Sequence, residues 1–215
     1  MSEPSSRPAR VHRVFSVGLT GGVASGKSLV ARQFVRLGAE LVDTDEIARE
    51  VVVPGEPGLA ALREEFGAGV ITPDGQLDRR ALRKLVFEDP DKRRHLETLL
   101  HPLIRARTLA RLEAASGPYA IVAVPLLVET DFGELVDRVL VVDAPEDAQL
   151  ERLMRRDGLP RAEAAAMIGS QAKRATRLAA AHDVIDNGAD ERATHAQVER
   201  LHHLYLDLAE RKTHT

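Results

Sequence analysis

Residues 14–28 read VFSVGLTGGVASGKS, a short apolar run that passes into a glycine-rich segment ending in Lys-Ser. Val14–Leu19 predicts a buried parallel strand because it is apolar and continuous. Gly21–Ser28 satisfies the pattern G-x-x-x-x-G-K-[ST] of a phosphate-binding loop. The apolar spacing over Ser28–Leu37 predicts a helix that Gly38 closes. Together these features predict the strand, loop and helix of a nucleoside triphosphate site.

The chemistry of such a loop follows from its backbone and its last two side chains. The backbone N–H groups surround a phosphate, and the helix N-terminus adds about half a positive charge. Lys27 can bridge the β- and γ-phosphates, and the Ser28 hydroxyl can take one Mg²⁺ position. A chance match in a glycine-rich turn is the alternative, and the flanking strand and helix argue against it. The expected nucleotide contacts are Gly21, Gly22, Val23, Ala24, Ser25, Gly26, Lys27, Ser28 and Leu29.

Further apolar runs predict the rest of a sheet. The expected strands are Val14–Leu19, Glu40–Asp43, Tyr119–Val124, Arg138–Asp143 and Asp183–Asp186. Helical patterns separate them, and strands that alternate with helices favour a parallel sheet covered on both faces. The predicted class is therefore α/β, a P-loop NTPase-type parallel five-stranded sheet flanked by helices.

About 75 residues separate the second and third expected strands, more than one crossover helix requires. Helical patterns there cover Leu59–Phe66, Arg79–Phe87 and Asp91–Leu112, and we expect His101-Pro102 to divide the last into two helices, with His101 near the N-cap of the second. After the fourth strand, Pro145 is expected at the first position of a helix that ends at Gly158-Leu159-Pro160. A second helix should run to about Ala181, and the last from about Glu191 to Arg211.

These patterns divide the chain into four parts. We expect a disordered N-terminal extension over residues 1–12, a nucleotide-binding core over 13–45, 117–147 and 182–215, a helical substrate-binding insert over 46–116, and a lid over 148–181.

Composition excludes several classes of protein. The formal charge is −3 and aromatic residues make up 3% of the chain, which argues against general nucleic-acid binding. Zero cysteines exclude a disulfide scaffold and fit a reducing, cytoplasmic setting. The longest apolar run has nine residues, so we expect no membrane span, and the polar start of the chain does not resemble a signal peptide.

Two carboxylates, Asp43 and Asp45, directly follow the second expected strand. Ligands gather at the carboxyl ends of parallel strands, so these side chains should lie beside the phosphate loop. One can serve as the base for an attacking hydroxyl and the other as a Mg²⁺ or water ligand. Either can instead cap the helix that begins near Glu46.

Residues 149–177 carry seven basic and three acidic side chains, a net charge of +4. Arginines above a triphosphate stabilise the charge that develops in phosphoryl transfer, and a closing lid excludes water. Arg152 and Arg156 share a helical face and are the candidates for phosphate contact. A solvated helical face is the alternative. The insert is also locally basic, around Arg79 among others, which predicts an anionic acceptor. His101 is either a ligand contact or a helix cap.

Several segments occur in a specific order: DTDEIAR over 43–49, DGQLDR over 74–79, HPLI over 101–104, PLLVE over 125–129, Ser170-Gln171 and DVIDN over 183–187. In these segments the chain resembles the dephospho-coenzyme A kinase family, from about Phe15 to Gly188. The resemblance implies transfer of the ATP γ-phosphate, with Mg²⁺, to the ribose 3′-hydroxyl of dephospho-CoA, the last step of coenzyme A synthesis.

The resemblance also implies residue roles. Asp45 is the expected base, Lys27 and Arg156 hold the transferring phosphate, and Asn187 lies beside the adenine. The residues expected at the acceptor are Asp43, Arg79, His101, Leu126 and Glu129, and the Mg²⁺ ligands are Ser28 and Asp43. The chain departs from the family at Leu29, where a hydroxyl residue is usual, at Val128 and at His182; we expect these changes to affect affinity and not the reaction.

Two alternatives stay open at this point. One is another P-loop small-molecule kinase, of the nucleoside monophosphate or shikimate kinase type. The other is a nucleotide-binding regulatory module, against which the carboxylates and the arginine-rich lid argue. We expect a monomer or a small homo-oligomer.

Overall fold

A computed structural model describes residues 14–188 and 190–214. Its described residues form one five-stranded sheet in the order β2-β3-β1-β4-β5, with every pairing parallel. The strands are β1 (Ser16–Gly21), β2 (Glu40–Asp43), β3 (Ala120–Ala123), β4 (Arg138–Asp143) and β5 (Asp183–Asp186). This confirms the predicted fold class. The extension expected over residues 1–12 lies outside the described residues.

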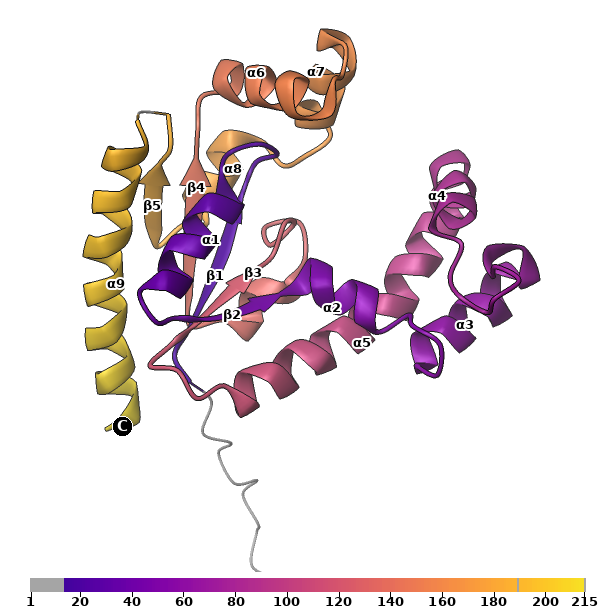
Figure 1. Cartoon of the computed structure of the whole chain (residues 1–215), viewed down its shortest axis with the longest axis horizontal. Helices are drawn as coiled ribbons and strands as arrows, with labels where there is room; N and C mark the ends of the chain where they lie inside the picture. Colours follow the sequence, from indigo (N-terminus) through magenta and orange to yellow (C-terminus); the bar gives the residue numbers. More distant parts are fainter. Residues whose placement is uncertain (1–13, 189, 215) are drawn as a thin grey trace, which may run out of the picture.

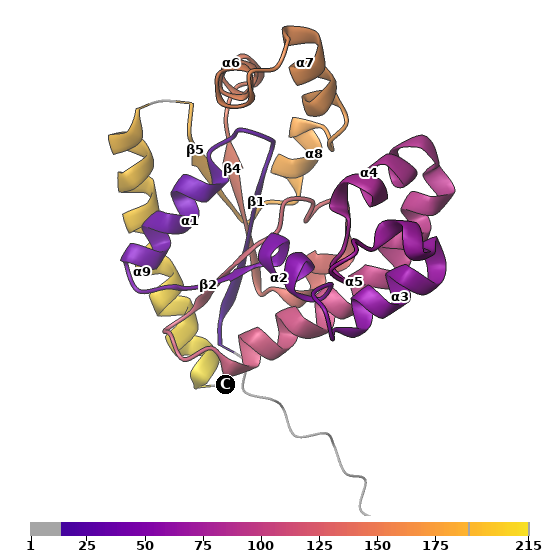
Figure 2. The same ribbon diagram turned by 45° about the vertical axis from the view of Figure 1, so that its right-hand side comes forward.

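One face of the sheet is covered by α1 (Lys27–Arg36) and α9 (Glu191–Thr213), which lie side by side in both ribbon views (Figures 1 and 2). Their apolar cluster includes Leu19 of β1, Phe34 of α1 and Tyr205 of α9. Ile121 of β3 faces the same cluster, whereas its neighbours Ala120 and Val122 face the opposite one. This alternation follows from the period of two along a strand, and it buries the sheet on both sides.

The opposite face is covered by the segment between β2 and β3 and by the short η2 helix (Asp131–Leu135). That segment contains α2 (Thr44–Glu50), α3 (Pro57–Phe66), η1 (Ala68–Val70), α4 (Arg79–Glu88) and α5 (Pro90–Ala114). In Figure 1, α3 and α4 project well to one side of the sheet, and α5 runs back to its edge. The three predicted helical patterns of the insert are therefore present.

The predicted break at His101-Pro102 is wrong, because α5 continues through Pro102 as one helix of 25 residues. Proline removes one backbone hydrogen bond and strains the turn before it. Leu99 and Leu100 before the proline, and Leu103 and Ile104 after it, pack against one apolar cluster. Continuing the helix keeps all four in contact with that cluster, and this burial outweighs the local cost.

The segment after β4 forms α6 (Glu146–Asp157), α7 (Arg161–Gly169) and α8 (Arg174–Ala179). Gly158 ends α6 in the left-handed conformation, as expected, whereas Pro145 is the N-cap residue and not the first helical residue. The predicted single helix to Ala181 is also wrong, since the chain leaves helical geometry between Gly169 and Arg174. Figure 1 shows α6 and α7 above the end of the sheet at which the β1–α1 loop lies.

Candidate active site

The loop between β1 and α1 has a tightly folded backbone. Gly26 caps α1 in the left-handed region with φ of 99°, and Ala24 adopts φ of 56°. A Cβ added at Gly22 would lie 2.5 Å from Gln149 Oε1 and 2.9 Å from an Arg177 nitrogen. A side chain at that position would displace both partners, which explains why glycine is required there. The loop therefore presents bare backbone toward the space above it.

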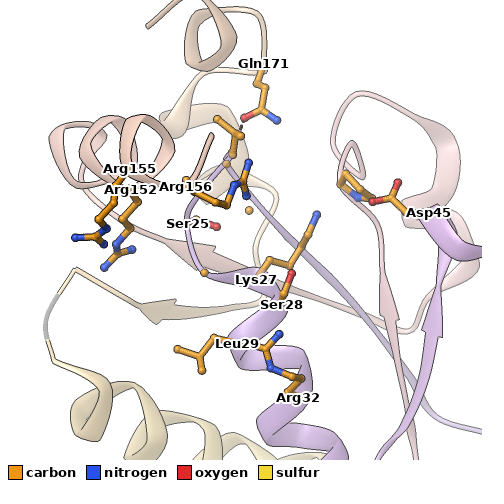
Figure 3. A pocket seen from close by; sticks show the side chains of 16 residues that line it. Ser25, Lys27, Ser28, Leu29, Arg32, Asp45, Arg152, Arg155, Arg156 and Gln171 are labelled. Carbon is orange, nitrogen blue, oxygen red and sulfur yellow. Dashed lines mark hydrogen bonds between the residues drawn. The ribbon is translucent and has the colours of Figure 1, made fainter. Parts of the chain in front are cut away.

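That space is a cavity of about 630 Å³. Every residue from 21 to 29 lines it, as the motif predicted. The other lining residues come from distant parts of the chain: Arg32, Asp45, Pro125, Arg152, Arg155, Arg156 and Gln171. Figure 3 shows Lys27 and Asp45 on facing sides, with Arg156 extending from α6 toward Lys27 and with Arg152 and Arg155 below α6, farther from Asp45. The cavity has the size of a small-molecule site and is strongly basic.

Lys27 is half-buried and lines this cavity. Burial lowers the pKa of its ammonium group, and the nearby carboxylates of Asp45, Asp43 and Glu129 act in the opposite direction. The Lys27 ammonium group loses solvation by water on burial, and a bound polyphosphate can stabilise its charge instead.

The two carboxylates after β2 differ in position. Asp43 caps α2, and its Oδ1 accepts a hydrogen bond of 2.8 Å from the Asp45 N–H. Asp45 lies in the first turn of α2 and its side chain lines the cavity, whereas Asp43 does not line it. The capping alternative thus holds for Asp43, and Asp45 is the carboxylate that faces the phosphate loop.

The arginines of α6 have different partners. Arg152 donates a hydrogen bond of 2.8 Å to the Asn187 carbonyl, and its Nη1 is buried without a protein partner. Arg156 pairs with the neighbouring Asp157 at 2.7 Å. Arg155 also lines the cavity, whereas its sequence position predicted only a contribution to the charge of the segment. Arg174 is held by Asp143 in a two-pronged ion pair, which leaves the α6 arginines as the basic groups over the loop.

Asn187 is buried behind the phosphate loop, and its side chain is occupied. Its Nδ2 donates to the Ser25 carbonyl at 2.7 Å, and its Oδ1 accepts from the Thr194 hydroxyl at 2.8 Å. A Cβ at Gly26 would lie 2.0 Å from that Nδ2. The Asn187 side chain therefore stabilises the loop from behind.

The other acceptor candidates do not line the cavity. Arg79 is the first residue of α4 and is exposed, and Leu126 is 46% exposed in the loop after β3. His101 lies inside α5 with its ring 6.1 Å from that of Phe132, so it is not a helix cap. Glu129 accepts a hydrogen bond of 2.9 Å from the Ala172 N–H. The structure thus brings most of the residues predicted to bind the nucleotide together around one cavity, whereas the residues predicted to bind the acceptor lie outside it.

Four lining residues were not predicted: Arg32, Pro125, Arg155 and Gln171. Arg32 lies one helical turn beyond Ser28, so helical periodicity alone could have placed it near the loop. Gln171 comes from the turn between α7 and α8; Ser170-Gln171 is one of the segments of the family resemblance, but that segment assigned Gln171 no role. Among residues 14–188 and 190–214, no group of three or more His, Cys, Asp or Glu side chains could hold a metal ion.

The described helices include none that is both long and apolar enough to cross a bilayer.

The doubly covered parallel sheet, with a phosphate loop that opens into a basic cavity, defines a P-loop kinase fold. The family model described as dephospho-CoA kinase matches residues 15–192. The chain belongs to the dephospho-CoA kinase family.

Individual relatives agree with this assignment. The dephospho-CoA kinase of Aeromonas hydrophila is 50% identical over 198 residues, which is 91% of this chain and 97% of that protein. The one from Dechloromonas aromatica (strain RCB) is 52% identical over 199 residues, covering 92% and 96%. Among solved structures, TT1252 from Thermus thermophilus matches with a TM-score of 0.79 at 29% identity, covering 88% of this chain and 96% of its own.

Proposed function

We propose that this chain is a dephospho-CoA kinase that transfers the γ-phosphoryl group of ATP to the ribose 3′-hydroxyl of dephospho-CoA, giving CoA and ADP, the last step of coenzyme A biosynthesis. The observation that carries the proposal is the cavity above the phosphate loop, in which Lys27 and Asp45 lie on facing sides. A nucleotide-binding module without chemistry needs the loop but no carboxylate opposite it. Relatives about half identical over nine-tenths of the chain carry this activity in their names.

The phosphate loop and the α6 arginines bind the donor in this mechanism. The backbone of residues 21–29 surrounds the phosphates, and Lys27 meets the β- and γ-phosphate oxygens. Arg156 gives up its ion pair with Asp157 and contacts the transferring phosphate. Arg152, which donates a hydrogen bond to the Asn187 carbonyl, lies near the nucleotide. Preorganised positive groups around the transferring phosphate stabilise the charge of the transition state.

Asp45 acts as the general base. It accepts the proton of the 3′-hydroxyl as the new bond from that oxygen to the γ-phosphorus forms and the bond from phosphorus to the β-phosphate bridging oxygen breaks. ADP leaves with the electron pair of the broken bond. The Asp43 side chain caps α2 and so fixes the backbone that carries Asp45.

Mg²⁺ accompanies ATP in this proposal, held by the Ser28 hydroxyl, which lines the cavity, and by the Asp43 carboxylate, whose Oδ1 caps α2 and whose charge acts on Lys27. These groups fit the ion, because Mg²⁺ in phosphoryl-transfer sites binds one or two carboxylate or hydroxyl groups and takes its remaining ligands from phosphates and water. A cluster of three protein acids is therefore not needed. Bound there, the ion would neutralise charge on the β- and γ-phosphates.

The acceptor lies between the core and the insert. We assign residues 46–116 to acceptor binding and 148–181 to the lid, with the core over 13–45, 117–147 and 182–215. In this assignment Arg79 and His101 belong to the insert, whereas Leu126 and Glu129 belong to the core, and closure of the insert over the core brings the four residues to the acceptor. The protein acts in the cytoplasm, without nucleic acid, as a monomer or small homo-oligomer.

The test is ADP release with ATP in the presence and absence of dephospho-CoA, together with shikimate and a nucleoside monophosphate as competing acceptors. The expected result is ADP formation that depends on dephospho-CoA alone and yields CoA. ADP formation that follows another acceptor would establish a different small-molecule kinase. ATP binding without acceptor-dependent ADP would establish the regulatory module.

A further inference from the structure

The turn between α7 and α8 interrupts helical geometry over residues 170–173, a stretch that contains no proline. Local sequence does not force the interruption, since the segment Ser-Gln-Ala-Lys can continue a helix. Two of its residues instead bond to distant parts of the chain. The contacts made by this turn therefore account for the break.

Gln171 reaches the phosphate loop directly. Its Oε1 accepts a hydrogen bond of 2.7 Å from the backbone N–H of Val23, a residue 148 positions earlier in the chain. In Figure 3 the Gln171 side chain extends from the turn toward the loop. The Val23 N–H donates to Gln171, and the Ser25 N–H donates to the Gly22 carbonyl, so these two bonds fix the first half of the loop.

Two further contacts hold the same turn. The Ala172 N–H donates to Glu129, and the Ala172 carbonyl accepts from the Arg177 guanidinium. Arg177 is only 6% exposed and lies against Gly22. Within the part of the chain that the structure describes, no carboxylate forms an ion pair with Arg177, and its guanidinium lies directly behind the phosphate loop. A buried, unpaired guanidinium beside an anion site favours anion binding.

We propose that Gln171 and Arg177 are positioning residues that hold the phosphate loop in its phosphate-binding conformation from the lid side. The inference rests on the proposed function, because it assigns a role in donor binding to that same site. Neither residue contacts the reacting atoms in this proposal; each acts through the backbone of Gly22 and Val23. Donor affinity thereby depends on the position of the turn between α7 and α8.

The experiment compares Gln171→Met, Gln171→Glu and the control Gln76→Met, an amide on an exposed turn of the insert. Steady-state kinetics give KM for ATP and for dephospho-CoA separately, calorimetric titration gives ATP affinity directly, and melting temperature reports folding. Loss of one hydrogen bond predicts that Gln171→Met raises KM for ATP about 3- to 10-fold, with KM for dephospho-CoA unchanged. Gln171→Glu keeps the acceptor oxygen but adds a negative charge at the cavity, so it should weaken ATP more, and added salt should reduce that excess.

A purely structural role would lower the melting temperature of Gln171→Met and leave ATP affinity at the wild-type value, and this result would overturn the inference. So would equal effects of Gln171→Glu and Gln171→Met at all salt concentrations. Absence of dephospho-CoA turnover in the wild type is a separate outcome, which removes the proposed function, while the titration with ATP still decides the role of Gln171.

Arg177 gives a second comparison. Arg177→Lys keeps the charge and loses the hydrogen-bonding fork, whereas Arg177→Met loses both. If the charge favours the anion, ATP affinity should follow the order wild type, Arg177→Lys, Arg177→Met among variants that melt cooperatively. Equal ATP affinity in the two variants contradicts the electrostatic part of the proposal.

Discussion

Asp45 is the single side chain on which turnover depends most in this mechanism. It lines the cavity opposite Lys27, while the adjacent Glu46 does not line it. Replacement by asparagine keeps the shape and removes the proton acceptor. We expect Asp45→Asn to lower kcat by about 10²- to 10⁴-fold with ATP affinity retained, measured by coupled ADP release and calorimetry.

Glu46→Gln is the matched control for Asp45→Asn, since it removes an exposed carboxylate from the same helical turn. It should keep the wild-type rate. A rate for Asp45→Asn within threefold of wild type would remove Asp45 as the base.

Side chains in the nucleotide half of the site could be predicted from sequence because the motif is contiguous. Lys27 and Ser28 follow from the loop pattern, and Asp45 follows from the rule that strand ends meet at one edge. The contact of Gln171 with Val23 could not be predicted, because it spans 148 positions and the segment Ser170-Gln171 carries no local pattern for a break between two helices. For Asn187, sequence did indicate a place near the nucleotide site, but not that Ser25 and Thr194 occupy its side chain.

Strand boundaries were predicted more closely than helix boundaries. β2, β4 and β5 have the expected limits, since short apolar runs between turns leave little freedom. The errors concern α5, which continues through Pro102, and the break between α7 and α8. In both places long-range packing or hydrogen bonding outweighs local propensity, and a single sequence does not contain that information.

The interior proline of α5 predicts a stability gain. Pro102 lacks the N–H that would bond to the Thr98 carbonyl, whereas Pro90 occupies the first turn, where proline is tolerated. We therefore expect Pro102→Ala to raise the free energy of unfolding by about 1–2 kcal/mol, after allowing for the greater entropy of its unfolded chain. Pro90→Ala should give no gain; denaturant unfolding measures both, and equal effects would contradict the argument.

Helix α9 is attached to the sheet through a buried histidine. His202 Nδ1 lies 2.8 Å from the Tyr119 hydroxyl, and burial together with the neighbouring His203 lowers the pKa of His202. The native state therefore prefers neutral His202, whereas the unfolded chain binds a proton near the ordinary value of 6.5. Stability from this group is complete above pH 6.5 and is lost as the pH falls below it.

We expect the melting temperature to fall between pH 7 and pH 5, and we expect His202→Gln to reduce that fall while keeping a hydrogen-bonding partner for Tyr119. His195→Gln, which changes an exposed histidine of the same helix, is the matched control and should keep the wild-type fall. The same pH dependence in wild type and His202→Gln would exclude His202 as its source.

Positive and negative charge are concentrated in different parts of the molecule. Residues 149–177 carry +4 and the remainder −7, which together make the formal −3. In the structure Arg174 is paired with Asp143 and Arg177 is buried, so the field over the cavity comes chiefly from the α6 arginines and Lys27. An overall acidic protein thus offers a locally positive entrance to a polyanion.

This separation of charge predicts that kcat/KM for ATP depends on salt concentration. Raising NaCl from 50 to 300 mM shortens the screening length, so kcat/KM for ATP should fall on the order of three- to tenfold. Sucrose at equal osmolality is the control and should have little effect. A value of kcat/KM that is insensitive to NaCl would show that the charge separation does not assist donor capture.

The contacts of Asn187 and Gln171 with the phosphate loop also determine how late in protein synthesis that loop gains its supporting hydrogen bonds. The glycine-rich motif emerges from the ribosome early, yet the Ser25 carbonyl and the Val23 N–H find their partners only when residues 187 and 171 have been made. At roughly 5–20 residues per second, the 148 positions between Val23 and Gln171 leave the motif without that support for about 7–30 seconds. A nascent chain should therefore begin to retain ATP only near completion, which stalled chains of increasing length would measure.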